Sequence, residues 1–164
     1  MKKLFLLPIM MFALVGCNKP AGGPQTVTFE AADFTTVTLN GSTQVAAELE
    51  KDGVKVAFTK VTRYEWSIVE GEDKVQELRI GKQANGSSTM TITGKTITRI
   101  DFVSQLDLGS SAYGPTFDAS AGEMSSITVG ERNQTAYWSG ESDNLVLSAK
   151  TNQVRAYSFT ITYK

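Results

Sequence analysis

Histidine is absent from this chain of 164 residues, and cysteine occurs once, at Cys17. Without histidine, a Ser-His-Asp or Cys-His nucleophile system and the usual zinc sites are excluded. With one cysteine, no disulfide can form within the chain. Chemistry that relies on carboxylates alone, as in many glycosidases, is not excluded. The composition therefore excludes the sites that depend on histidine and leaves carboxylate chemistry open.

An excess of positive charge is also lacking. Lysine and arginine number 16 against 17 acidic residues, and the formal net charge is −1. Nucleic acids select a basic face, and anionic membranes select polybasic segments. We therefore expect no nucleic-acid partner. The one long apolar run, Leu4–Val15, contains Pro8 and is shorter than the ~20 residues that a membrane-spanning helix needs.

The first residues have the parts of a secretory signal: Lys2 and Lys3, the apolar run, and then Leu14-Val15-Gly16-Cys17. This ending resembles the lipobox of bacterial lipoproteins. The resemblance implies cleavage before Cys17 and a lipid on its thiol. An ordinary signal peptide with a chance cysteine is the alternative.

The lipobox resemblance predicts the organisation of the chain. Residues 1–16 are the expected signal peptide, 17–25 a lipidated N-terminus with a short tether, and 26–164 a single domain. Asn18 follows the cysteine in place of Asp, which in lipoproteins of double-membrane bacteria favours the outer membrane. We therefore expect an exported protein, anchored to the cell envelope by lipid on Cys17, in the outer membrane.

Beyond the tether, apolar and polar residues alternate with period two, as in antiparallel strands that are buried on one face. Turn signals, among them Asp52-Gly53, Gly94-Lys95 and Ser139-Gly140, separate the strands. We expect an all-β antiparallel sandwich or jelly roll with at most one or two short helices. The inward residues are expected to be Val27 and Phe29, Val54, Val56 and Phe58, Met90 and Ile92, and Tyr157, Phe159, Ile161 and Tyr163.

Two segments depart from this alternation. Gln44–Lys51 is rich in helix formers, has Ser42 and Thr43 before it and Gly53 after it, and predicts a short helix. Residues 105–123 predict a long loop that contains Tyr113 and Phe117. Such a loop within a compact domain is either functional or a variable connection.

The stretches Gly94–Phe102, Trp138-Ser139-Gly140, Leu145–Leu147 and Phe159–Tyr163 resemble small galactose-binding-like modules of exported proteins from gut Gram-negative bacteria. The resemblance covers most of residues 50–164. It implies a jelly-roll fold and transfers fold better than function. The segment Lys60–Val75 departs from the pattern, since a shorter turn is expected there.

Aromatic side chains are the candidates for a ligand site, because sugars stack on aromatic rings while polar groups bind their hydroxyls. For Trp66 and Tyr113 a ligand platform and a structural role are both open, and for Trp138 a core role is the favoured alternative. Asp118 is a candidate polar partner. The predicted ligand-binding residues are Trp66, Tyr113, Trp138, Tyr64 and Asp118.

No cofactor is expected. Glu30–Phe34 distantly resembles the opening of modules that ligate calcium, but Ala32 stands where the second acidic ligand is expected. Glu70, Glu72 and Asp73 lack a calcium-loop signature and are interpreted as a solvated turn.

These observations predict a non-catalytic, membrane-anchored lipoprotein that binds a ligand outside the cytoplasm, with a glycan as the expected ligand. A structural or accessory subunit of an envelope or fimbria-like assembly is the alternative, which would use an exposed strand edge. A small glycoside hydrolase is the third possibility, and it requires two carboxylates that face each other across a cleft.

Overall fold

The structure is a computed structural model that describes residues 22–67, 74–83, 86–105, 113–150 and 153–164, and of residues 66, 82, 83 and 86 the backbone alone. Cys17, the first part of the predicted tether and residues 106–112 of the predicted loop lie outside the described residues. Within the described part, no helix is long and apolar enough to cross a membrane.

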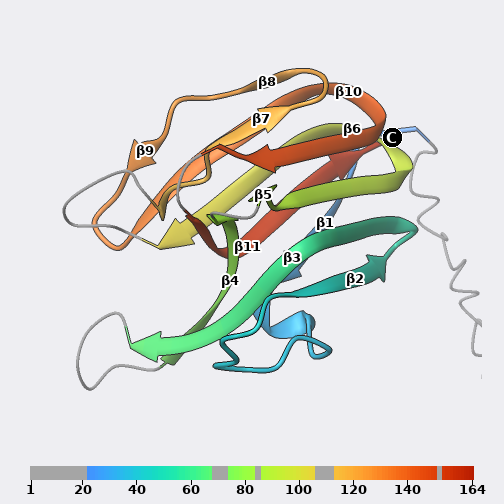
Figure 1. Ribbon diagram of the computed structural model, residues 1–164. Coiled ribbons are helices and arrows are strands. Elements are labelled where there is room, and N and C mark those ends of the chain that lie inside the picture. Colours follow the sequence, from blue (N-terminus) through green and yellow to red (C-terminus); the bar gives the residue numbers. More distant parts are fainter. Residues whose placement is uncertain (1–21, 68–73, 84–85, 106–112, 151–152) are drawn as a thin grey trace, which may run out of the picture.

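The chain is all-β, as predicted, and Figure 1 shows its strands in two layers. The paired strands form an antiparallel sheet of 11 strands, and a 3₁₀ helix follows the first. The jelly-roll type that the resemblance implies stays a prediction. The elements are β1 Gln25–Glu30, η1 Ala31–Asp33, β2 Val45–Lys51, β3 Val54–Ser67, β4 Lys74–Gln83, β5 Gly86–Ser87, β6 Thr89–Gln105, β7 Phe117–Ala119, β8 Glu123–Met124, β9 Thr128–Val129, β10 Asn133–Ala149 and β11 Gln153–Tyr163.

The two layers share their longest strands. The first part of β6 pairs with β3, from Phe58↔Met90 to Lys55↔Thr93, and its second part pairs with β11. Strand β10 follows β6 along both parts. On the other side, β4 pairs with both β3 and β11. The sheet therefore folds over on itself and encloses a core.

Two of the expected turns are bends inside these long strands. The prediction of a turn at Gly94-Lys95 is wrong, because β6 continues through it. Gly94 has a φ of +96°, and a Cβ there would lie 2.2 Å from the carbonyl oxygen of Gly53. Only glycine at position 94 permits both this bend and this close contact. The turn expected at Ser139-Gly140 is likewise a bend within β10, where the register with β6 shifts.

The core is aromatic where the layers meet. The rings of Phe29 and Phe159 stack with centroids 5.3 Å apart, and Phe34 meets Phe58 at 5.4 Å. Phe102 packs against Phe159 at 6.1 Å. These rings come from strands β1, β11, β3 and β6 and from the residue after η1, so burial of the core holds distant segments together.

The prediction of a helix over Gln44–Lys51 is wrong, since Val45–Lys51 forms strand β2. The segment pairs with β3 through a two-residue turn at Asp52-Gly53, and both of these residues have positive φ. Ala47 is buried and Leu49 packs against the core. An isolated helix this short is marginal, and pairing with β3 therefore outweighs helix propensity.

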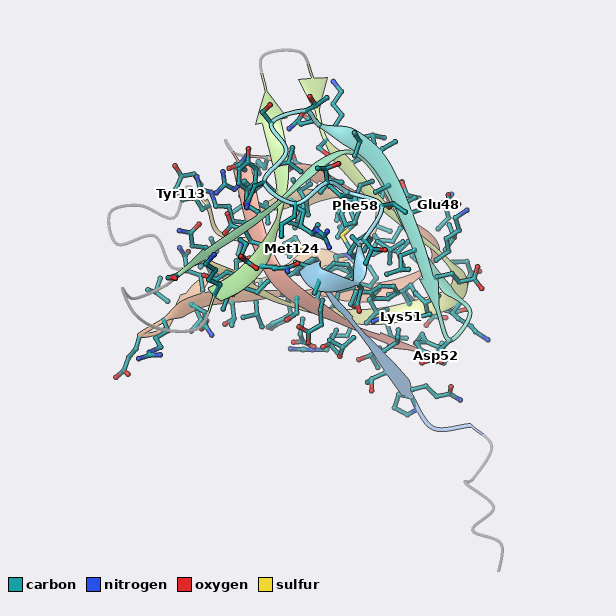
Figure 2. The ribbon with its side chains drawn as sticks, turned by 90° about the horizontal axis from the view of Figure 1, so that it is seen from below. Glu48, Lys51, Asp52, Phe58, Tyr113 and Met124 are labelled. Atoms are coloured by element: carbon teal, nitrogen blue, oxygen red, sulfur yellow. The ribbon has the colours of Figure 1, made fainter. Side chains whose placement is uncertain are left out.

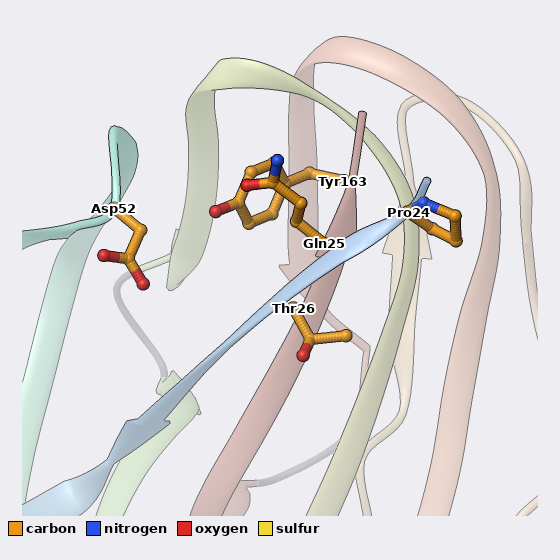
Figure 3. Close-up of a pocket in the computed structure, with 5 residues that line it drawn as sticks. All are labelled: Pro24, Gln25, Thr26, Asp52 and Tyr163. Atoms are coloured by element: carbon orange, nitrogen blue, oxygen red, sulfur yellow. The ribbon is translucent and has the colours of Figure 1, made fainter. Parts of the chain in front are cut away.

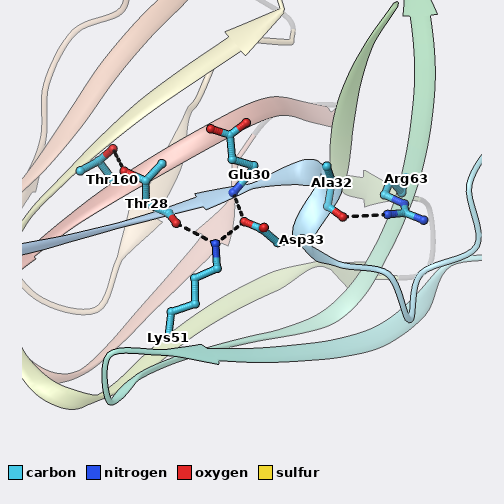
Figure 4. Close-up of polar contacts among 7 residues, drawn as sticks. All are labelled: Thr28, Glu30, Ala32, Asp33, Lys51, Arg63 and Thr160. Carbon is cyan, nitrogen blue, oxygen red and sulfur yellow. Dashed lines mark hydrogen bonds and ion pairs between the residues drawn. The ribbon is translucent and has the colours of Figure 1, made fainter.

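Lys51 ties the end of β2 to β1 (Figure 4). Its Nζ donates to the carbonyl oxygen of Thr28 at 3.0 Å and contacts Asp33 Oδ2 at 2.5 Å. Asp33 Oδ2 also accepts the backbone N–H of Glu30 at 2.6 Å. Burial alone would raise the pKa of Asp33, but the hydrogen bonds from Lys51 and Glu30 and the Lys51 charge hold this pKa below its ordinary value of 3.8.

We expect this contact to make the unfolding free energy depend on pH. A carboxyl whose pKa is lowered by folding contributes stability above pH 3.8, and that contribution is lost as the pH falls through the lowered pKa. Asp33→Asn removes the contribution, so the difference in unfolding free energy between wild type and variant should shrink from about pH 7 to about pH 3. Urea unfolding across this range measures it. A difference that stays constant would contradict the prediction.

Candidate functional site

Trp138, a predicted ligand residue, lies in the core. It stands in β10 opposite Ile100 and Met124 and is fully buried. Its Nε1 donates a hydrogen bond to the carbonyl oxygen of Ala121 at 2.7 Å. A sugar cannot reach this ring, and the core role that the sequence left open for Trp138 is the one observed.

Asp118, the predicted polar partner, lies on β7 and is exposed. Its carboxylate forms an ion pair with Lys150 at 3.2 Å, and both side chains are well exposed. A pair of this kind contributes little to stability, because solvent screens it. The structure therefore shows Asp118 in a surface ion pair.

Tyr64 and Tyr113, by contrast, are brought to one face of the sheet. Arg79 in β4 and Arg155 in β11 are direct cross-strand partners, so their side chains leave the sheet on the same side. The Arg79 guanidinium lies over the Tyr64 ring, and that of Arg155 over the Tyr113 ring, each 3.6 Å from the ring centroid. Two predicted residues thus share a face through two arginines.

A buried carboxylate holds the first of these arginines. Glu77 is fully buried, and its Oε1 accepts a hydrogen bond from Arg79 Nε at 2.6 Å. Tyr64 is the cross-strand partner of Glu77 on β3. A buried charge is tolerated only when it is paired, so Glu77 fixes the orientation of Arg79.

Neutral amides hold the second arginine. Arg155 Nε donates to Gln153 Oε1 at 3.0 Å, and its Nη1 donates to Gln105 Oε1 at 2.8 Å. With Tyr113 against its face, the guanidinium is fixed in position. The amides orient Arg155 but do not neutralise its charge.

Tyr157 joins this face because of a β-bulge. The sequence predicts that Tyr157 points inward with Phe159, and this is wrong. The register of β11 against β6 shifts between Ala156 and Ser158, so Ala156 and Phe159 are both buried while Tyr157 is only half-buried. One extra residue in a strand reverses the alternation after it.

The Tyr157 side chain has an unusual polar environment. Burial raises the pKa of its hydroxyl, and the negative charge of Glu77 raises it further, while Arg155 acts in the opposite direction. Among the described residues, the Tyr157 Oη is buried and makes no hydrogen bond. Because its pKa is raised, the hydroxyl stays protonated at any physiological pH.

A cavity of about 360 Å³ lies beside Tyr157. It opens where β1 and β4, which pair with successive parts of β11, separate around η1. Gln76 Oε1 lies near this opening and is buried without a hydrogen-bond partner in the structure. The lining residues are Glu30, Ala31, Ala32, Lys74, Val75, Gln76 and Tyr157.

We call this surface the Arg–Tyr face. Figure 2 shows Tyr113 on the opposite side of the molecule from Lys51 and Asp52. Cationic guanidinium groups and tyrosine rings lie together there, a combination that suits a polar ligand with flat apolar patches. The Arg–Tyr face consists of Tyr64, Glu77, Arg79, Tyr113, Arg155 and Tyr157.

Three predictions fall partly or wholly outside the described residues. Trp66 lies in β3 opposite Val75, and its side chain is among those not described. Cys17 and the acidic residues Glu70, Glu72 and Asp73 are also outside. Among the described residues, no group of three or more His, Cys, Asp or Glu side chains could hold a metal ion.

Sequence reasoning missed the arginines of the Arg–Tyr face. Arg79 lies between buried Leu78 and Ile80, and Arg155 lies between buried Val154 and Ala156. Each therefore occupies an ordinary outward position in an alternating strand. The one available signal is that these outward positions carry a charge rather than the usual threonine, and nothing local indicates that the two strands are neighbours.

A second depression lies at the start of β1, whereas the cavity beside Tyr157 lies at the end of this strand (Figure 3). Its lining is mostly polar, and Tyr163 from the end of β11 forms one wall. It adjoins Pro24 and Gln25, where the described chain begins β1. None of its described lining residues has a buried polar atom without a hydrogen-bond partner. The cavity beside Tyr157 differs, because Gln76 and Tyr157 each have one.

Comparisons of the chain with protein-family models, with curated proteins and with solved structures find no match.

Proposed function

We propose that the protein is a non-catalytic lipoprotein, anchored to the outer membrane by lipid on Cys17, whose β domain binds a glycan at the Arg–Tyr face. The observation that carries the glycan part is the cross-strand pair of Arg79 and Arg155, each stacked on a tyrosine. The lipobox residues before Cys17 support the anchoring part. The tether places the domain close to the membrane.

The chemistry of the face fits a sugar. A tyrosine ring offers an apolar surface to the CH groups of a pyranose, and guanidinium and hydroxyl donors bind its oxygens. Both tyrosines are half-buried and held by stacked arginines, so little conformational entropy is lost when a ligand binds. A preorganised face of this kind can bind a sugar without a large rearrangement of its side chains.

A glycan array with the purified full chain tests the proposal. We expect reproducible binding by the wild type and a loss of about tenfold or more in Tyr113→Ala, because the variant loses a ring platform and the support of Arg155. Trp66→Ala tests the remaining predicted platform. Tyr137→Ala is the matched control, since Tyr137 carries a stacked arginine, Arg99, on another part of the surface.

The array result can also exclude the proposal. Well-folded wild type that binds no glycan would exclude it. Equal losses in Tyr113→Ala and Tyr137→Ala would show that the binding site is not the Arg–Tyr face.

One observation favours the alternative of an accessory subunit in an envelope assembly. Among the described strands, β2 pairs with β3 alone, and its Val45 is 37% exposed. A depression lined by Ala46, Ala47 and Phe58 adjoins this edge. An open edge can accept a strand from another chain. Native-envelope cross-links at β2 would support this alternative, and a strict monomer without such cross-links would oppose it.

A further inference from the structure

We propose that the Arg–Tyr face recognises a carboxylate of an acidic saccharide, held between Arg79 and Arg155. This inference rests on the proposed glycan function and narrows it to one class of ligand. Neutral sugars, free anions and sulfated polymers are the competing ligands.

The charge of the Arg–Tyr face favours an anionic ligand. Like charges directly across two strands destabilise a sheet, and Arg79 and Arg155 are direct partners. Glu77 compensates Arg79 at 2.6 Å, while Arg155 is held by the neutral amides of Gln153 and Gln105. The described face thus carries two guanidinium groups and one carboxylate. An anion bound between the arginines would remove the imbalance.

The hydrogen-bond donors of the two arginines favour a carboxylate. A guanidinium carries five N–H donors in a planar fork that matches the two oxygens of a carboxylate. Arg79 uses Nε for Glu77, and Arg155 uses Nε and Nη1 for the two glutamines. Within the described structure, the remaining Nη groups make no hydrogen bond. Donors on both arginines are therefore available to one planar anion.

The surroundings of the arginines favour a sugar that carries the carboxylate. Each guanidinium lies 3.6 Å from the centroid of a tyrosine ring, that of Tyr64 or Tyr113, and the ring restrains it. A small free anion would use only the arginines. A carboxylated sugar would use the arginines for its carboxylate and the apolar tyrosine surface for its ring.

The test uses one polymer in two charge states. Oligogalacturonate and its methyl ester have the same sugar rings, and only the first has carboxylates. By titration calorimetry with the full chain in mild detergent, we expect the free acid to bind about tenfold or more tightly than the ester. We also expect the affinity for the acid to fall as salt rises.

Variants locate the effect. Arg155→Gln should weaken acid binding about tenfold or more and remove the preference over the ester. Arg155→Lys keeps the charge but loses the planar fork of donors. Its affinity for the acid should therefore lie between those of the wild type and Arg155→Gln. Arg99→Gln is the control, because Arg99 stacks on Tyr137 at 4.0 Å but is already bound to Asp101. If Arg155→Gln fails to fold, Arg155→Lys replaces it, because losing the planar fork should still weaken binding of the acid.

Each other outcome overturns the inference. Equal affinity for acid and ester, or preference for neutral glycans on the array, overturns it and leaves the proposed function standing. Tight binding of dextran sulfate without oligogalacturonate overturns the choice of carboxylate. A loss in Arg99→Gln as large as in Arg155→Gln shows a nonspecific charge effect. No glycan binding at all overturns the proposed function and the inference together.

Discussion

Trp138→Ala should lower the unfolding free energy by about 3–5 kcal/mol, a large part of the ~5–15 kcal/mol that a domain commonly has. The Trp138 ring is fully buried, and its Nε1 hydrogen bond to Ala121 ties the segment before β8 to β10. A Cβ at Gly122 or Gly140 would lie 2.7 Å from Trp138 Cζ2, so both glycines pack tightly on this ring. Alanine would leave a cavity and an unpaired carbonyl.

Urea unfolding measures this loss, and the neighbouring residue supplies the control. Tyr137 is 40% exposed and stacks on Arg99 at the surface. Tyr137→Ala should therefore cost no more than about 1 kcal/mol. Trp138→Phe keeps most of the ring volume, so its loss of unfolding free energy should lie between those of the two alanine variants. Similar losses for Trp138→Ala and Tyr137→Ala would mean that Trp138 is not part of the core.

Cys17→Ser should abolish membrane attachment of the full chain expressed in a bacterial host with lipoprotein processing. Each buried CH₂ group contributes about 0.8 kcal/mol, and two or three acyl chains anchor stably where one anchors only marginally. The hydroxyl of serine cannot replace the thiol as the lipid acceptor that the lipobox resemblance implies.

Two measurements check the effect of Cys17→Ser. Wild type should incorporate labelled fatty acid and partition into detergent, whereas the variant should do neither. Asn18→Ala changes the adjacent residue, keeps the thiol, and should behave like wild type in both assays. If Cys17→Ser still partitions into detergent, the anchor is not the lipid on this cysteine.

Local alternation predicted the strands well because each strand buries one face. The inward positions of Val54, Val56 and Phe58 are confirmed, and so is the turn at Asp52-Gly53. The helix propensity of Gln44–Lys51 led to a wrong prediction. A short segment with helix formers gains more stability by pairing with β3 than by forming an isolated helix. Pairing between strands is a property of the fold that propensity does not measure.

The candidate site was only partly predictable. Tyr64 and Tyr113 were named from their residue type, but nothing in the sequence indicates that they share a face. That depends on the partnership of Arg79 with Arg155, which are 76 positions apart and meet only because β4 pairs with β11. The sequence predicts that Tyr157 points into the core. The extra residue of the β-bulge places its side chain on the Arg–Tyr face instead.

By itself, the sequence determined the all-β antiparallel class, the inward faces of most strands and the absence of histidine chemistry, because these follow from residue type and from period-two burial. It also contains the lipobox residues on which the proposed anchoring at Cys17 depends. Only the tertiary structure decided that Trp138 is buried, that β6 and β10 bend through both layers, and that two arginines oppose each other beside Tyr157. Those features arise from contacts between residues far apart in the chain, and such contacts form only when the strands have found their register.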